Sequence, residues 1–203
     1  MKIGICSAMA KEIDISLDYI GVDRGIEVLI DQGIKPIYAI GDFDSIRDEN
    51  LLSNLKIERL PTRKDVTDTH AALEYVIDKG YDEVDIYGVT GGRLDHFFGA
   101  MCLLEKYSDI KIRIIDNQNI IELLKPGRHK VYGDEYKYFS LFACNGSYID
   151  IKHAQYQLDN YYLKHDDPLC VSNQVIDGFA YIKNSENVIL IRTKDSTVIC
   201  MYR

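Results

Sequence analysis

The first half of the chain alternates short apolar runs with stretches of helical spacing. Between residues 24 and 32, Ile26, Leu29 and Ile30 recur on one helix face, and Gly33 suits a helix C-terminus. The apolar runs between these helical stretches are as short as buried strands of a parallel sheet usually are. Strands are predicted over 2–6, 19–22, 37–40, 57–60, 84–89 and 112–115, and helices over 24–32, 67–79 and 94–106. Strands and helices that alternate in this way predict an α/β domain with a mostly parallel sheet.

The pattern changes after Asp116, where helical spacing stops and strand-like runs follow one another. Pro126-Gly127 is a turn signal, and Asn145-Gly146 between two strand-like runs predicts a hairpin. Strands are predicted over 120–124, 136–143, 148–152, 171–176, 179–182, 188–192 and 198–201. Short strands with regular turns are typical of a β-sandwich or barrel. We therefore predict an α/β domain over 1–125 and an all-β sandwich domain over 126–203.

Composition narrows the class of protein. The chain has 203 residues, of which 46% are hydrophobic and 28% charged, so it has enough apolar content to bury a core. The formal net charge is -8 and no long basic run appears, which argues against nucleic-acid binding. The five cysteines are widely spaced without a CxxC pair, which argues against structural zinc and a disulfide framework. The apolar run at 2–6 is far too short to cross a membrane, so we expect a soluble, cytoplasmic protein.

Two aspartates directly follow the apolar run 37–40, in the segment Gly41-Asp42-Phe43-Asp44-Ser45. In open α/β sheets, ligands bind beyond the carboxyl ends of the strands. Two carboxylates in such a loop need a cation or hydrogen-bond donors, and hard oxygen ligands suit Mg²⁺. Aspartate and glycine also favour turns by themselves, so a plain turn is the alternative interpretation.

A second acidic group lies at Lys64, Asp65, Thr67 and Asp68. A lysine beside two carboxylates suits a site where phosphate and a metal ion meet. Alternatively, Thr67 or Asp65 caps the helix predicted to begin there, and the acids are favoured by the helix dipole.

The third group, Gly91-Gly92-Arg93-Leu94-Asp95-His96, lies between a predicted strand and a predicted helix. Glycines let the backbone approach a ligand closely, and the helix N-terminus offers N–H groups to an anion. Arg93 has the forked geometry to clamp a phosphate, whereas Asp95 is alternatively a plain helix N-terminal residue, and His96 is alternatively a partly buried residue beside Phe97. The chain has neither GxxxxGK[ST] nor GxGxxG, so no P-loop or dinucleotide fold is predicted. Together the three groups favour phosphoryl or diphosphoryl transfer.

Four segments, in this order, resemble the thiamine pyrophosphokinase family. They are Gly21-Val22-Asp23-Arg24-Gly25, GDFDS at 41–45, Asp65-x-Thr67-Asp68 and GGRxDH at 91–96. The resemblance is strong over 20–117 and continues weakly through the second half. It implies an α/β catalytic domain followed by a β-sandwich, transfer of a diphosphoryl group from ATP to the hydroxyl of thiamine, and a homodimer with active sites between subunits.

The resemblance also implies roles for individual residues. Asp42, Asp44 and Asp68 would bind Mg²⁺ and the ATP phosphates, with Asp65 as a further carboxylate of the catalytic group. The other residues on the nucleotide side would be Asp23, Lys64, Arg93, Asp95, His96, Asp116 and Asn117. Ser172 and Asn173 would help to hold thiamine.

The chain departs from the family pattern in places. The segment Ser7-Ala8-Met9-Ala10 stands where the first strand usually runs into a glycine-rich turn, and Gln174 stands where an acid is common. The chain has no tryptophan, so stacking on thiamine must come from tyrosine or phenylalanine. Two alternatives stay open: a diphosphokinase or nucleotidyl transferase that uses another alcohol, and a protein that senses nucleotide or thiamine diphosphate without turnover.

Overall fold

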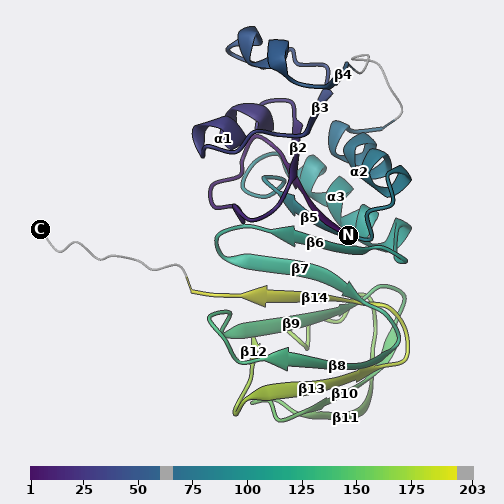
Figure 1. Ribbon diagram of the computed structural model, residues 1–203. Coiled ribbons are helices and arrows are strands. Elements are labelled where there is room, and N and C mark those ends of the chain that lie inside the picture. The colour runs from purple at the N-terminus through teal and green to yellow at the C-terminus, as the bar shows by residue number, and fades with distance from the viewer. Residues whose placement is uncertain (60–65, 196–203) are drawn as a thin grey trace, which may run out of the picture. The chain divides into compact units, whose positions relative to one another are not determined.

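The structure, a computed structural model, describes residues 1–59 and 66–195 (Figure 1). The chain forms two compact units, Met1–Asn117 and Gln118–Arg203. The division falls before residue 125, where the sequence predicted a domain boundary, because β7 (Asn119–Leu124) pairs with β14 (Val188–Thr193) of the second unit. No helix among the described residues is long and apolar enough to cross a membrane.

The first unit is built on a parallel sheet. Its strands are β1 (Lys2–Cys6), β2 (Tyr19–Val22), β3 (Tyr38–Gly41), β4 (Ile57–Arg59), β5 (Glu83–Tyr87) and β6 (Lys111–Ile115). They pair in the order β4-β3-β2-β1-β5-β6, and each pair is parallel. The central strands are short buried apolar runs, as expected for a sheet with both faces covered. The predicted α/β class is confirmed.

Three α-helices follow strands of this sheet, close to the predicted ranges. They are α1 (Gly25–Asp31), α2 (Asp68–Asp78) and α3 (Leu94–Lys106). At the start of α2 the Thr67 side chain accepts a hydrogen bond from the His70 N–H at 3.2 Å, so the predicted capping role of Thr67 is confirmed. A 3₁₀ helix at Glu49–Asn54 (η1) was not predicted, because so short an element shows no periodicity.

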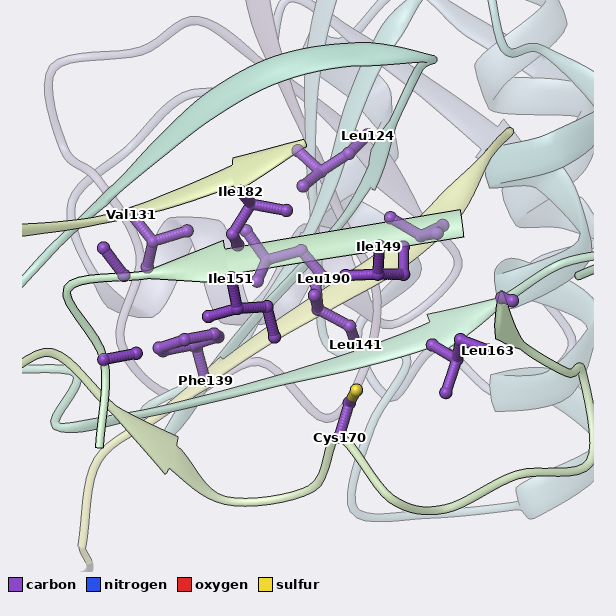
Figure 2. Close-up of a cluster of buried hydrophobic side chains, with 14 residues drawn as sticks. Leu124, Val131, Phe139, Leu141, Ile149, Ile151, Leu163, Cys170, Ile182 and Leu190 are labelled. Carbon is purple, nitrogen blue, oxygen red and sulfur yellow. The ribbon is translucent and has the colours of Figure 1, made fainter. Parts of the chain in front are cut away.

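The second unit is a sandwich of two antiparallel sheets, as predicted. One sheet has the order β12-β9-β14-β7, with β12 (Asn173–Gln174) and β9 (Tyr138–Ala143). The other has the order β11-β10-β13-β8, with β11 (Leu158–Leu163), β10 (Ser147–Lys152), β13 (Phe179–Asn184) and β8 (Gly127–Tyr132). Side chains from both sheets meet in one apolar core, which includes Leu141, Ile149 and Ile182 (Figure 2).

Two predictions about the second unit need correction. Asn145-Gly146 does not close a hairpin: β9 pairs with β12 and β14, whereas β10 pairs with β11 and β13, so this turn takes the chain from one sheet to the other. The strand predicted over 171–176 shrinks to β12, because Ser172 has φ 60° and leaves the extended conformation. The strand predicted over 198–201 lies outside the described residues.

Candidate active site

A cavity of about 380 Å³ lies at the carboxyl ends of the parallel strands in the first unit. Its walls come from the loops after β1, β2, β3 and β5 and from the starts of α2 and α3. The lining residues are Ser7, Ala8, Met9, Val22, Asp23, Ser45, Thr67, Asp68, Thr69, Gly88, Val89, Gly92, Arg93 and His96. This is the edge at which open α/β sheets bind ligands. Of the predicted site residues, the cavity brings together Asp23, Asp68, Arg93 and His96.

Asp23 follows β2 and is held against the loop that follows β3. Its φ is 47°, and its N–H donates to the Ile40 carbonyl at 3.1 Å. The Phe43 N–H donates to Asp23 Oδ1 at 3.4 Å. A Cβ added at Gly41 would lie 1.8 Å from Asp23 Oδ1, so no residue larger than glycine fits there without displacing the carboxylate. The glycine of the GDFDS segment therefore makes room for the Asp23 side chain.

Asp42 and Asp44 form a turn beside this cavity and do not line it. The Asp44 N–H donates to Asp42 Oδ1 at 3.2 Å, and Phe43 between them has φ 60° and a buried side chain. Arg59 Nη1 donates to the Asp42 carbonyl at 3.1 Å. The plain-turn interpretation therefore describes this backbone correctly. The Asp44 side chain is exposed, and a metal-binding role for the two aspartates stays a prediction.

Asp68 is the first residue of α2 and lines the cavity between Thr67 and Thr69. Lys64 and Asp65 lie outside the described residues. Ser7 Oγ, from the loop after β1, lies 3.4 Å from Thr69 Oγ1, so two neighbouring hydroxyl groups also line the cavity. Neither Ser7 nor Thr69 was a predicted site residue. Its position directly after the first strand could have identified Ser7, because ligands of open α/β sheets bind beyond the carboxyl ends of the strands.

Arg93 and Asp95 form an exposed ion pair at the start of α3. Arg93 Nε donates to Asp95 Oδ1 at 3.1 Å, and Nη2 donates to Oδ2 in the second arm of the fork. This hydrogen bonding, with the nearby His96 N–H, lowers the pKa of Asp95 to about 2. Of this pair, Arg93 lines the cavity and Asp95 does not. The part of Asp95 is therefore to orient the Arg93 guanidinium.

The remaining predicted residues are divided between the two units. His96 is exposed and lines the cavity, so the alternative that it is partly buried beside Phe97 is wrong. Asp116 and Asn117 follow β6 and do not line this cavity. Ser172 and Asn173 line another cavity, of about 450 Å³, within the second unit.

The carboxylates of the cavity fit one kind of magnesium site. Within residues 1–59 and 66–195, no group of three or more His, Cys, Asp or Glu side chains could hold a metal ion. The predicted three-aspartate cluster of Asp42, Asp44 and Asp68 is therefore not preassembled. Mg²⁺ is usually held by one or two carboxylates together with water and substrate phosphates. Asp23 and Asp68 in one cavity match that arrangement, and they do not match a closed cage of protein ligands.

Replacing Gly88 by alanine is expected to damage both the fold and the cavity. Gly88 has φ 80°, and an added Cβ would lie 2.3 Å from the Ser7 carbonyl oxygen and 2.5 Å from the Ala10 nitrogen. The loop after β1, which lines the cavity, would have to move. Gly80 is a matched control, because its φ is 85° but nothing lies within 4 Å of its added Cβ. Gly80→Ala should cost only the roughly 1–2 kcal/mol of the left-handed conformation. Denaturant unfolding and steady-state kinetics measure both effects, and equal losses in the two variants would contradict the steric argument.

Two family models and a curated relative, all of one family, match nearly the whole chain. The family model for the thiamin pyrophosphokinase catalytic domain matches residues 11–115, and the model for the thiamin pyrophosphokinase vitamin B1 binding domain matches residues 128–189. A thiamine pyrophosphokinase of Bacillus subtilis (strain 168) is 37% identical over 192 residues, covering 87% of this chain and 87% of the relative.

Solved structures give the same result. The crystal structure of thiamine pyrophosphokinase from Bacillus subtilis aligns with a TM-score of 0.86 at 33% identity and covers 96% of this chain and 100% of its own. The crystal structure of thiamin pyrophosphokinase from Geobacillus thermodenitrificans aligns with a TM-score of 0.86 at 31% identity. It covers 97% of this chain and 99% of its own. The chain therefore belongs to the thiamine pyrophosphokinase family.

Proposed function

We propose that this protein transfers the diphosphoryl group of ATP to the hydroxyl of thiamine, giving thiamine diphosphate and AMP. The observation that supports this most directly is the convergence of Asp23, Asp68 and Arg93 on one cavity at the strand ends. Such a cavity offers carboxylates to a metal ion, a guanidinium to phosphate oxygens and the N-termini of two helices to an anion.

In this mechanism the thiamine hydroxyl attacks the β-phosphorus of ATP, and AMP leaves. Arg93 contacts phosphate oxygens and offsets their negative charge. Asp95 accepts a hydrogen bond from Arg93 Nε and so keeps the Arg93 guanidinium oriented. Asp23 and Asp68 would hold Mg²⁺, with Asp42 and Asp44 in the adjoining turn as further carboxylates. When bound, Mg²⁺ would supply positive charge that offsets the charge of the phosphates. A carboxylate that accepts the hydroxyl proton has a secondary part, because a loose transition state gains little from early deprotonation.

The two units take different parts in this proposal. The first, including Lys64 and Asp65, binds ATP and Mg²⁺, with His96, Asp116 and Asn117 on the nucleotide side. The second binds thiamine near Ser172. Two subunits form a homodimer with active sites between them, in the cytoplasm.

An assay of both products tests the proposed reaction. Incubation with ATP, Mg²⁺ and thiamine is expected to give AMP and thiamine diphosphate in equal amounts, without thiamine monophosphate. Chromatography with fluorescence detection of the oxidised thiamine esters measures one product, and an AMP assay the other. ADP with thiamine monophosphate would indicate single phosphoryl transfer and contradict the proposal. AMP without a thiamine ester would instead favour a diphosphokinase for another alcohol.

A further inference from the structure

The loop after β3 that carries Asp42 and Asp44 is attached to α1 through apolar side chains. Phe43, between the two aspartates, is 3% exposed and belongs to one buried apolar cluster with Ile26 of α1. Ile46, further along the loop, packs against the same cluster. Apolar contacts are non-directional, so they hold the loop on α1 without fixing the position of its polar backbone groups.

A carboxylate of α1 supplies a directional contact to the same loop. Glu27 Oε1 accepts the N–H of Arg47 at 2.6 Å. Glu27 Oε2 accepts Arg24 Nε at 3.1 Å, so both oxygens of the carboxylate are engaged. The bond from the Arg47 N–H is the main cause that lowers the pKa of Glu27, so this group is ionised at neutral pH. Hydrogen bonds to an ionised acceptor are stronger than those between neutral groups.

The start of the loop has contacts of its own. The Asp42 carbonyl accepts a hydrogen bond from Arg59 Nη1 at 3.1 Å, and the Arg59 guanidinium lies over the Phe43 ring, 5.3 Å from its centre. Glu27 binds the backbone on the other side of Asp44. The position of the Asp44 carboxylate therefore depends on contacts at both ends of a short loop.

We propose that Glu27 is a positioning residue, whose carboxylate fixes Asp42 and Asp44 beside the cavity through the Arg47 backbone. This inference rests on the proposed function, since it takes the two aspartates as further carboxylates of the site for Mg²⁺ and ATP. Ser45 of the same loop lines the cavity, whereas Glu27 does not, so Glu27 acts through the loop and not by contact with a ligand. Mg²⁺ demands near-ideal octahedral geometry, so a carboxylate on a poorly fixed loop binds it less well.

The alternative is that Glu27 only forms an ion pair with Arg24 on the surface of α1. Exposed pairs at this spacing contribute little to stability. The Glu27 side chain, however, is only 14% exposed, and its shorter contact is the one to the Arg47 N–H. The geometry therefore favours attachment of the loop as the main role of this carboxylate.

Glu27→Ala tests this role by kinetics. Alanine is a strong helix former, so α1 should form in the variant. The Mg²⁺ concentration that gives the half-maximal rate is expected to rise about tenfold, the scale of one hydrogen bond to a charged group, with the KM for thiamine unchanged. Glu27→Gln keeps an oxygen for the Arg47 N–H and should give a smaller rise. It also tests the inference if Glu27→Ala does not fold.

Asp31→Asn is the matched control for Glu27→Gln. Asp31 is exposed at the C-terminal end of the same helix, so the variant removes the same charge from α1. Its Mg²⁺ dependence should equal that of the unmodified protein. An equal rise in Asp31→Asn and Glu27→Gln would show that only the charge of α1 matters, and would overturn the inference.

Two measurements do not require turnover. Hydrogen–deuterium exchange of the protein without ligands should be faster over residues 42–47 in Glu27→Ala and unchanged over β5, because the Arg47 N–H loses its acceptor. Calorimetry with Mg²⁺ and α,β-methylene ATP, whose bridging carbon blocks the reaction, should show binding about tenfold weaker than in the unmodified protein.

The outcomes separate this inference from the proposed function. A folded Glu27→Ala protein with unchanged exchange over 42–47, or with unchanged Mg²⁺ dependence and nucleotide binding, overturns the positioning role. A loss of stability without an effect specific to Mg²⁺ overturns it as well, since a merely structural role predicts that result. Absence of thiamine diphosphate in the unmodified protein refutes the proposed reaction instead, and exchange and calorimetry then still decide the role of Glu27.

Discussion

Asp68→Asn is expected to lower kcat by roughly 100-fold or more, the scale of losing one electrostatic stabiliser at a reacting phosphate. Asn has nearly the shape of Asp but lacks the charge that a metal ion and its phosphates require. The fold should survive, because the cap of α2 is the Thr67 hydroxyl, which accepts from the His70 N–H. Loss of an acid in the first turn should cost only about 0.3–1 kcal/mol.

The control for this variant lies at the other end of the same helix. Asp78 is exposed at the C-terminal end of α2, away from the cavity, so Asp78→Asn removes the same charge without touching the site. Its kcat should equal that of the unmodified protein. Steady-state rates at saturating ATP, Mg²⁺ and thiamine, with circular dichroism for folding, decide the matter. A folded Asp68→Asn protein with full activity would remove Asp68 from the phosphate and metal site.

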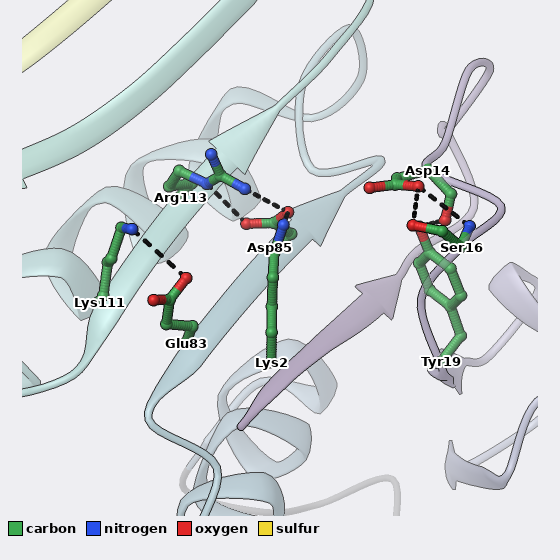
Figure 3. Close-up of polar contacts among 8 residues, drawn as sticks. All are labelled: Lys2, Asp14, Ser16, Tyr19, Glu83, Asp85, Lys111 and Arg113. Carbon is green, nitrogen blue, oxygen red and sulfur yellow. Dashed lines mark hydrogen bonds and ion pairs between the residues drawn. The ribbon is translucent and has the colours of Figure 1, made fainter.

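Asp85→Ala is expected to lower the free energy of unfolding by about 3 kcal/mol. Asp85 is 2% exposed, and its carboxylate accepts two hydrogen bonds from Arg113 at 2.8 and 2.7 Å and pairs with Lys2 at 2.9 Å (Figure 3). These contacts join β1, β5 and β6. Removal of the carboxylate takes away the buried counter-charge that these two partly buried cations share. For a chain of this length the loss corresponds to a fall in Tm of roughly 6–12 °C.

The neighbouring pair of Glu83 and Lys111 joins the same two strands β5 and β6 and serves as the control (Figure 3). Its Lys111 Nζ lies 3.3 Å from Glu83 Oε2, but the two side chains are 54% and 41% exposed, far more than that of Asp85. Exposed pairs contribute about 0–1 kcal/mol, so Glu83→Ala should change Tm little. Thermal and denaturant unfolding of the two variants give the comparison. Equal destabilisation would show that burial does not decide the strength of these pairs.

Local pattern predicted most elements of the first unit but missed parts of the second. The bounds of α3 agree with the predicted helix 94–106, because its apolar spacing covers more than two turns. β8 was not predicted, because Arg128, His129 and Lys130 make its sequence polar. It becomes a strand by pairing with β13, which is distant in the sequence. The false hairpin at Asn145-Gly146 has the same origin, since turn residues do not reveal which strands pair.

By itself, the sequence determined the α/β class and the sandwich through periodicity, and the family through its motifs. It also placed Asp68 and Arg93 at one edge of the sheet, because both follow predicted strands, whereas the family resemblance supplied Asp23 and His96. Only the tertiary structure decided that Asp95 turns to Arg93, that Asp42 and Asp44 close a turn, and that the Asn173 amide binds the Tyr156 backbone. Short polar side chains can form hydrogen bonds with many different partners. Which partner they have depends on the segments that tertiary packing brings within hydrogen-bond distance.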